Sequence, residues 1–374
     1  MQDVRSLFPY LESGRIYLNH AATGPWSTYV EDAVRRATEV FVRGDIEIYQ
    51  SFLRVLGETR VLAGDMLGCA PERVAFVQNT SEGLNVLASG LAWKPGDRIV
   101  LAEQEFPANV YPFLNATRHG VELDFVPQRN GVIELADVER AIGPRTVLVA
   151  LSWVQFLSGY TIDLKALSDL CAARNVLLSI DAIQGLGALR LDLRETPVDF
   201  LSAGVQKWQL APQGVAVIYA SERAQERIAQ AHFGWLSVGH AWDFFDYRLA
   251  PRDDARRYEN GTYNTVGIFG THGSYSLFQR VGMENVERSV RALANHAYER
   301  IAEKGFPLLT PADPARRAGI VTFRHDRADA VAETLHRRGI TVSARSGHIR
   351  IAPHFYNTTD EIDAAVRAIA ELER

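Results

Sequence analysis

The 374-residue sequence contains only two cysteines, Cys69 and Cys171, which lie far apart and outside any C-x-x-C spacing. Two scattered cysteines in a chain of this length argue against a disulfide framework and favour a reducing compartment, which we take to be the cytoplasm. The chain also lacks any run of about 18 apolar residues, so no segment is predicted to span a membrane. Residues 1–15 are charged and have no long apolar core, so they do not read as a signal peptide.

Charge of one sign is not in excess either. Lysine and arginine together number 40, aspartate and glutamate number 45, and the formal net charge is −5. Without a basic surplus, neither nucleic acid nor an anionic membrane surface is an expected partner. The ten histidines show no H-x-H or H-E-x-x-H spacing, which disfavours a metal hydrolase. The stretch GLGALR (185–190) lacks the third glycine of a dinucleotide-binding turn, which disfavours a dinucleotide enzyme.

What the sequence does contain is an alternation of apolar runs and helical patterns. Seven runs rich in Val, Ile and Leu mostly lack strict polar–apolar alternation, as expected for strands buried on both faces: 73–78, 98–102, 122–128, 146–153, 176–180, 199–204 and 214–220. Segments with helical spacing lie between several of them: 81–91, 136–143 and 163–175. This order predicts an α/β fold with a mostly parallel seven-stranded sheet covered by helices.

The last third of the chain reads differently. Segment 233–262 is crowded first with aromatic and then with charged residues, and we interpret it as a long functional loop or lid. It is followed by a helical stretch, three short strands and a closing helix: 266–304, 319–325, 340–345, 348–354 and 359–373. We expect a large domain over residues 16–270 and a smaller α+β C-terminal domain over 271–374, with residues 1–15 packing near the small domain.

Polar residues follow three of the predicted strands. Thr80 and Ser81 come after the first strand at the start of a helix, where backbone amides favour a phosphate. Asp181 ends the run 176–180, and Lys207 follows the run 199–204. Each has an ordinary structural explanation when taken alone: a helix cap, a capping carboxylate, a solvated turn. In open α/β sheets, however, ligands bind at the carboxyl ends of the strands. A phosphate site, a carboxylate and a lysine at one such edge match pyridoxal 5′-phosphate (PLP).

Seven motifs then extend the match along nearly the whole chain. They are YLNHAATGP (17–25), NTSEGLN (79–85), EFPANVYPF (105–113), SIDAIQGLGAL (179–189), VQKW (205–208) with ENGTYN (259–264), and IRIAPHFYNTTDEID (349–363). In this order they resemble the class V aminotransferase family of fold-type I PLP enzymes, which includes cysteine desulfurases, kynureninases and alanine–glyoxylate aminotransferases. The resemblance implies the same fold and PLP as the cofactor.

The resemblance also implies roles for the matching residues. Lys207 would bind the cofactor as a Schiff base and move protons, and Asp181 would pair with the pyridinium nitrogen. Phe106 would stack on the cofactor ring. The other expected cofactor-binding residues are Gln184 at the ring hydroxyl and, at the phosphate, Thr80, Ser81, Gln206 and Thr262.

Substrate and subunit contacts follow from the same resemblance. Arg350 would bind the α-carboxylate of an amino-acid substrate, for which a planar bidentate donor is suited. His20 and Gln155 lie in matching segments that approach the substrate. Thr262 matches a threonine that reaches the phosphate of the neighbouring subunit, so a homodimer is expected.

Departures from the family pattern bear on the reaction. The stretch SARSGHIRIAP crosses the region where desulfurases carry a reactive cysteine, yet it has no cysteine and little room for a loop. A persulfide-forming desulfurase is therefore disfavoured. A phosphate-binding serine is replaced by Gly204, and Gln206 resembles the aminotransferase side of the family. We expect an aminotransferase. The alternatives are a C–S lyase, an isopenicillin-N-epimerase-like epimerase and a non-catalytic binding module.

Overall fold

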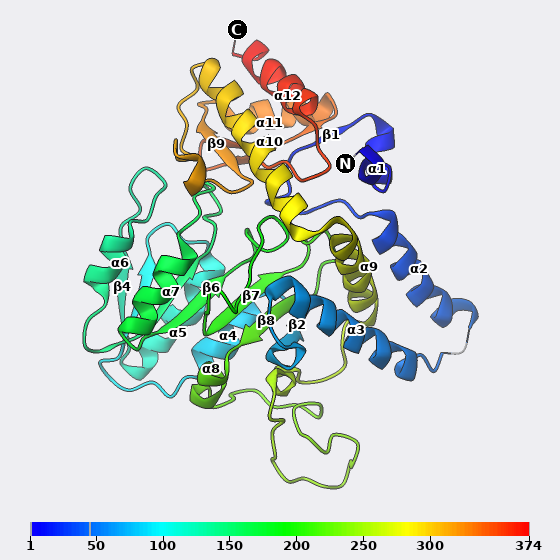
Figure 1. Ribbon diagram of the computed structural model, residues 1–374, viewed down its shortest axis with the longest axis vertical. Helices are drawn as coiled ribbons and strands as arrows, with labels where there is room; N and C mark the ends of the chain where they lie inside the picture. Colours follow the sequence, from blue (N-terminus) through cyan, green and yellow to red (C-terminus); the bar gives the residue numbers. More distant parts are fainter. Residues whose placement is uncertain (1, 45, 374) are drawn as a thin grey trace.

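A seven-stranded sheet forms the centre of the computed structural model, which describes residues 2–44 and 46–373 (Figure 1). Its strands stand in the order β2-β8-β7-β6-β5-β3-β4. Only β8 runs antiparallel to its two neighbours, and every other pair is parallel. The predicted α/β fold with a mostly parallel seven-stranded sheet is confirmed. The strands are β2 (Val74–Val77), β3 (Arg98–Ala102), β4 (Glu122–Val126), β5 (Thr146–Ser152), β6 (Leu177–Asp181), β7 (Phe200–Gly204) and β8 (Ala216–Ala220).

Helices cover both faces of this sheet. Strand β3 illustrates the reason: Ile99 and Leu101 belong to one apolar cluster, whereas Val100 and Ala102 belong to another. Successive strand side chains point to opposite faces, so a strand covered on both sides must be apolar at nearly every position. One face packs against α3 (Tyr49–Leu67), α6 (Leu135–Ala141), α7 (Leu164–Ala173) and α9 (Thr265–Val281). The other packs against α4 (Thr80–Gly90), α5 (Tyr111–Ala116) and α8 (Glu222–Arg227).

A smaller α+β unit lies above the sheet in Figure 1, coloured yellow to red. Its three-stranded antiparallel sheet has the order β11-β12-β9 and packs against three helices. Leu18, from the N-terminal segment, joins the same apolar cluster. The elements are α10 (Met283–Glu303), β9 (Val321–Arg324), α11 (Ala328–Arg337), β11 (Ser343–Arg345), β12 (His348–Ile351) and α12 (Thr359–Glu371).

Two predicted elements of this unit are each divided in the structure. The predicted helix 266–304 breaks at Gly282, whose φ of 82° favours glycine and ends α9 before α10 begins. The predicted strand 340–345 becomes two strands with different partners. Strand β10 (Ile340–Thr341) pairs in parallel with β1 (Ile16–Tyr17), whereas β11 pairs with β12. The domain boundary at residue 270 stays a prediction.

The remaining helices lie towards the N-terminus and in the connections. Arg5 of α1 (Gln2–Arg5) forms an ion pair with Glu361 of α12, which ties the first residues to the smaller unit. Helix α2 (Thr28–Arg43) packs against α9. Short 3₁₀ helices are Pro9–Ser13, Pro71–Arg73, Pro107–Asn109, Thr117–His119, Ala255–Tyr258 and Pro314–Arg316. Among the described residues, none of the helices combines the length and apolar character needed to cross a bilayer.

Segment 233–262, predicted as a long loop, lies mostly in an irregular connection that runs from the end of α8 to the 3₁₀ helix Ala255–Tyr258. In Figure 1 it extends from the lower edge of the molecule, away from the smaller unit. Trp242 packs edge-to-face on Tyr49 of α3 with ring centroids 5.4 Å apart. Phe245 and Tyr247 are almost fully exposed. The described contacts thus attach this loop to α3 and leave its tip in solvent.

Candidate active site

Lys207 lies in the loop between β7 and β8, beyond the carboxyl end of β7. Its side chain is half-buried, with Nζ 5.5 Å from the centroid of the Phe106 ring. The pKa of Lys207 is lowered to about 8, chiefly by burial; the carboxylate of Asp181 opposes this shift, whereas Arg350 and Arg345 add to it. A solvated turn would leave a lysine near its ordinary pKa of about 10.4. The structure therefore gives Lys207 an amine that can exist in its neutral form close to neutral pH.

Asp181 is the last residue of β6 and is buried. The backbone N–H of Ile183 donates to Oδ1 at 3.0 Å, and no other described residue donates to this carboxyl group. The pKa of Asp181 is raised to about 7, chiefly by burial and also by the neighbouring Glu105, while the Ile183 hydrogen bond and Lys207 oppose the shift. A buried carboxylate is costly unless a charged or hydrogen-bonding partner balances it. The free Oδ2 is therefore suited to a cationic N–H donor such as a protonated ring nitrogen.

Glu105 is a second buried carboxylate that the sequence analysis did not single out. It accepts hydrogen bonds from the backbone N–H of Ser152 at 2.7 Å, from the Ser152 hydroxyl, and from Nε2 of Gln155 at 3.0 Å. Burial raises the pKa of Glu105 in spite of these bonds. Its position was readable from the sequence, because it follows β3 at the same carboxyl edge of the sheet.

Two of the three predicted glutamines, Gln155 and Gln184, have amide orientations set by their neighbours. Nε2 of Gln155 donates to Glu105, so its buried Oε1 is left without a hydrogen-bond partner. Oε1 of Gln184 accepts from the indole N–H of Trp208 at 2.8 Å, and Nε2 donates to the Ala21 carbonyl at 3.0 Å. A carboxylate accepts hydrogen bonds and an indole N–H only donates. Exchanging the amide oxygen and nitrogen of either glutamine would therefore break its hydrogen bond to Glu105 or Trp208. Oε1 of Gln155 is thus available as a hydrogen-bond acceptor for a ligand, and Nε2 of Gln184 still has one N–H that can donate.

Thr80 and Ser81 begin α4, as predicted from the sequence. The Asn79 side chain caps this helix by accepting from the Glu82 amide at 2.9 Å, which leaves the amides of Thr80 and Ser81 for a ligand. Oγ1 of Thr80 accepts from the Gly204 amide at 2.9 Å and so joins α4 to the end of β7. Ser81 and Phe106 line one open cavity of about 390 Å³.

Gly204 makes room for the side chain of Gln206. A Cβ atom added at Gly204 would lie 2.5 Å from Oε1 of Gln206 and 3.2 Å from Oγ1 of Thr80. A side chain at this position would therefore require the Gln206 amide to shift. In the structure, the Gln206 amide occupies space beside Gly204 that a serine side chain would share.

Arg350 extends from β12 of the smaller unit to the larger one. It is buried, and its Nη1 donates to the Phe156 carbonyl at 2.6 Å while Nε donates to Oγ of Ser343 at 3.2 Å. It forms no ion pair with any described carboxylate. Burial and the nearby Arg345 lower its pKa to about 10, so it remains a cation at neutral pH. A buried cation without a counter-ion is costly, which makes the site receptive to an anionic ligand.

His20 is fully buried behind the lysine loop. Its Nδ1 lies 2.7 Å from the Ala352 carbonyl and its Nε2 lies 2.5 Å from the Tyr356 hydroxyl. Burial lowers the pKa of His20 to about 4, so the ring is neutral. Its ring centroid is 6.0 Å from that of Trp208. With both nitrogens bonded to protein, His20 supports the residue next to Lys207 and has no free polar atom for direct contact with a substrate.

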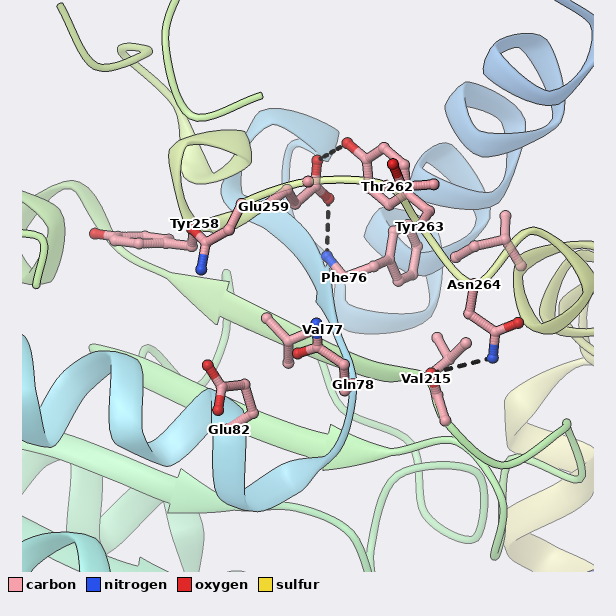
Figure 2. Close-up of a pocket in the computed structure, with 14 residues that line it drawn as sticks. Phe76, Val77, Gln78, Glu82, Val215, Tyr258, Glu259, Thr262, Tyr263 and Asn264 are labelled. Atoms are coloured by element: carbon pink, nitrogen blue, oxygen red, sulfur yellow. Dashed lines mark hydrogen bonds between the residues drawn. The ribbon is translucent and has the colours of Figure 1, made fainter. Parts of the chain in front are cut away.

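Thr262 lies apart from the other predicted residues. It is exposed and lines a separate cavity of about 350 Å³, seen in Figure 2. Glu259 anchors this segment by accepting from the Phe76 amide at 2.9 Å and the Tyr263 hydroxyl at 2.7 Å, as the dashed lines show. It also pairs with the buried Arg60 at 2.8 Å. Thr262 therefore faces outward, and its contact with a neighbouring subunit stays a prediction.

Comparisons with known proteins bear on this arrangement. The family described as "Aminotransferase class-V" matches residues 16–368. The uncharacterized aminotransferase YcbU of Bacillus subtilis is 29% identical over 82% of this chain and 80% of its own length. The apo structure of a cysteine desulfurase from Thermococcus onnurineus is 25% identical, with a TM-score of 0.89 over 99% of this chain and 97% of that one. A mutant of C-DES with glycine covalently linked to its PLP cofactor is 22% identical, with a TM-score of 0.91 over 98% and 99%.

These similarities agree with the order of motifs and the sheet topology. They confirm the predicted family resemblance and the fold-type I architecture. They also extend over almost the entire chain, so the likeness is not confined to one domain. The chain belongs to the aminotransferase class-V family.

Proposed function

We propose that this protein catalyses the transamination of an α-amino acid, with PLP as its cofactor. The enzyme class and the cofactor follow from membership of the aminotransferase class-V family. The substrate class is inferred from Arg350. Its guanidinium is buried, has no counter-ion among residues 2–44 and 46–373, and is near enough to lower the pKa of Lys207. An α-carboxylate bound there would bring the substrate's amine and Cα–H towards that lysine.

The residues present fit PLP. The free amides of Thr80 and Ser81, with the Gln206 side chain, would hold its phosphate, and Asp181 has an oxygen free for a ring N–H. The exposed face of Phe106 would stack on the ring, and the unpartnered Oε1 of Gln155 supports a polar group in this space. When bound, PLP supplies an electron sink for the electrons released at the substrate Cα.

The chain's own groups supply binding and proton transfer. Lys207 would hold the cofactor covalently and, once displaced by the substrate amine, would take the proton from Cα. A pKa of about 8 gives Lys207 a useful neutral fraction at physiological pH, as efficient general bases require. Arg350 would fix the α-carboxylate in a bidentate geometry, and the Phe106 and Phe156 rings would limit water near the reacting carbon.

The test is to mix the holoenzyme with a panel of amino acids while recording its absorption spectrum. Transamination converts the cofactor to its pyridoxamine form, and a keto acid added afterwards restores the original spectrum. Release of pyruvate with sulfide or a thiol would instead indicate elimination, and racemisation without loss of the amine would indicate an epimerase. Either of these results, in the absence of amine transfer, would overturn the proposal.

A C–S lyase is the second candidate, because the chain is 25% identical to a cysteine desulfurase over nearly its full length. A persulfide on the protein itself is not supported. Burial raises the pKa of Cys69 and of Cys171 to about 12, and neither lies near Lys207 in the fold. Cys69→Ala and Cys171→Ala should each keep activity within about threefold, measured as initial rates on the best substrate. A folded variant without turnover would mean that one thiol takes part.

We further propose a cytoplasmic homodimer whose active sites are shared. The outward-facing Thr262 and its anchored segment support this arrangement. Mixing inactive Lys207→Ala with inactive Thr262→Ala should restore part of the activity, because one of the hybrid's two sites then has both residues intact. An active monomer in sedimentation analysis would rule out the sharing. Two free cysteine thiols are consistent with the reducing cytoplasm.

A further inference from the structure

The hairpin formed by β11 and β12 carries a second arginine beside Arg350. Ser343 stands directly opposite Arg350, and Arg345 stands opposite His348. Cross-strand partners share a face of the sheet, and residues two apart in a strand share it as well. Arg345 and Arg350 therefore lie on one face as a diagonal pair, a geometry in which backbone positions are about 7–8 Å apart.

The turn between these strands holds Arg345 in place. Ser346 and Gly347 have φ values of 49° and 75°, the left-handed conformations of a two-residue hairpin turn. This turn leaves no additional loop residues between Arg345 and His348. The position of Arg345 relative to Arg350 is thus set by strand pairing.

The charge of Arg345 is not neutralised by any described residue. Its side chain is exposed, its Nη1 donates to the carbonyl of Ala344 at 2.8 Å, and it forms no ion pair with a described carboxylate. Its charge lowers the pKa of Arg350 and also that of Lys207, so it lies close to both. The side of the site nearest the hairpin therefore has two arginines, and in the described part of the chain no acidic side chain pairs with either of them.

We propose that Arg345 binds an anionic group on the substrate side chain, so that the preferred substrates are amino acids with an acidic side chain. The inference rests on the proposed function, in which Arg350 binds the α-carboxylate. Two guanidinium groups on neighbouring positions of one sheet face suit the two carboxylates of a small molecule such as aspartate or glutamate. The corresponding dicarboxylic keto acid would fit as the amino acceptor.

The test compares glutamate with glutamine and aspartate with asparagine, which differ in charge but little in size. The wild-type enzyme should favour the acidic member of each pair. Arg345→Gln should lower kcat/KM for the acidic member by about 10-fold and for the amide by less than about twofold, since a hydrogen bond to a charged group is lost only in the first case. Raising the salt concentration should weaken the wild-type preference, because Arg345 is exposed. Arg337→Gln is the matched control, since Arg337 is exposed on α11 and pairs only with its own helix.

Preference for the amides, or an equal effect of Arg345→Gln on both members of a pair, would overturn this inference and leave the proposed function intact. If no amino acid is turned over, the proposed function fails. The anionic subsite is then tested without turnover, by measuring the binding of succinate to the holoenzyme by calorimetry. Succinate binding that weakens about 10-fold in Arg345→Gln supports the anionic subsite. Absent or unchanged binding rejects it.

Discussion

The carboxyl edge of the seven-stranded sheet and the facing side of the three-stranded sheet differ in the ionisable groups that they hold. At the edge, Asp181 and Glu105 are buried acids with raised pKa values, and Lys207 is a half-buried amine with a lowered pKa. All three shifts favour neutral forms. On the small sheet, Arg350 and Arg345 remain cations without ion-pair partners among the described residues.

In the proposed function, this difference in how charge is held corresponds to two tasks of one site, proton transfer and recognition of the substrate. Groups that must gain and lose protons are placed where burial moves their pKa values towards neutrality. Groups that must recognise an anion are arginines, which keep their charge even when buried. In the proposed function, the chemistry would depend on the large sheet and the recognition of substrate on the small one. Four substitutions test this division.

The largest effect should come from Lys207→Ala. Loss of the proton-transfer group should lower kcat by at least about 10³-fold, within the range that general acid–base groups contribute. Borohydride reduction of the wild-type holoenzyme followed by peptide mapping should label Lys207, and the variant should give no label. Lys165→Ala is the control, because Lys165 is exposed and pairs with Asp169. A label on another lysine of the wild type would contradict the site assignment.

Arg350→Ala should lower kcat/KM by about 10²-fold, because a charge-assisted bidentate contact of about 1.5–3 kcal/mol is lost. Arg350→Lys should recover only part of this loss, since an ammonium cannot form the planar fork. The cofactor spectrum should stay unchanged in both variants. If recognition and chemistry were not divided between the two sheets, the alanine variant would lose its cofactor as well.

Asp181→Asn should change the pH dependence of stability in the cofactor-free protein. Its folded pKa of about 7 lies above the unfolded value of 3.8, so between these pH values the folded state binds the extra proton. Wild-type stability from this group therefore falls as pH rises from about 4 to 7. The asparagine variant lacks this group. Between pH 5 and pH 8 its stability relative to wild type should therefore rise by about 2–3 kcal/mol, since the wild type loses about 1.4 kcal/mol for each pH unit up to its folded pKa. Urea unfolding at both pH values measures the difference, and parallel curves would contradict it.

The smallest effect should come from Glu105→Gln. A neutral amide would release the orientation of Gln155, and kcat/KM should fall by only about three- to tenfold, the loss of one modest hydrogen bond. Removal of the nearby negative charge should also move the pH transition of Asp181 to lower pH. Glu103→Gln, at an exposed position two residues away, should change neither property. An unmoved transition in Glu105→Gln would show that the two carboxyl groups do not interact.

Much of the site could be predicted because its residues directly follow buried strands. Thr80, Asp181 and Lys207 were identified in this way, and the structure brings them to one edge. The place of Glu105 at the sheet edge was readable from the sequence, but its bonding to Ser152 at the end of β5 and to Gln155 just beyond was not. His20 matches a family motif, yet only the structure reveals that both its ring nitrogens are bonded to protein.

The sequence by itself determined the seven strands, since burial on both faces requires near-continuous apolar runs that are local in the chain. It also determined three of the helices between them, α4, α6 and α7, but not α5. It also determined which residue types end those strands. Only the tertiary structure decided which charged side chains, among the described residues, are left without an ion-pair partner. Arg350 is separated from Phe156 by 194 residues and from Lys207 by more than one hundred, and its burial depends on how the smaller unit packs against the larger one. Side-chain charge is a local property, whereas its desolvation and pairing depend on contacts between distant segments.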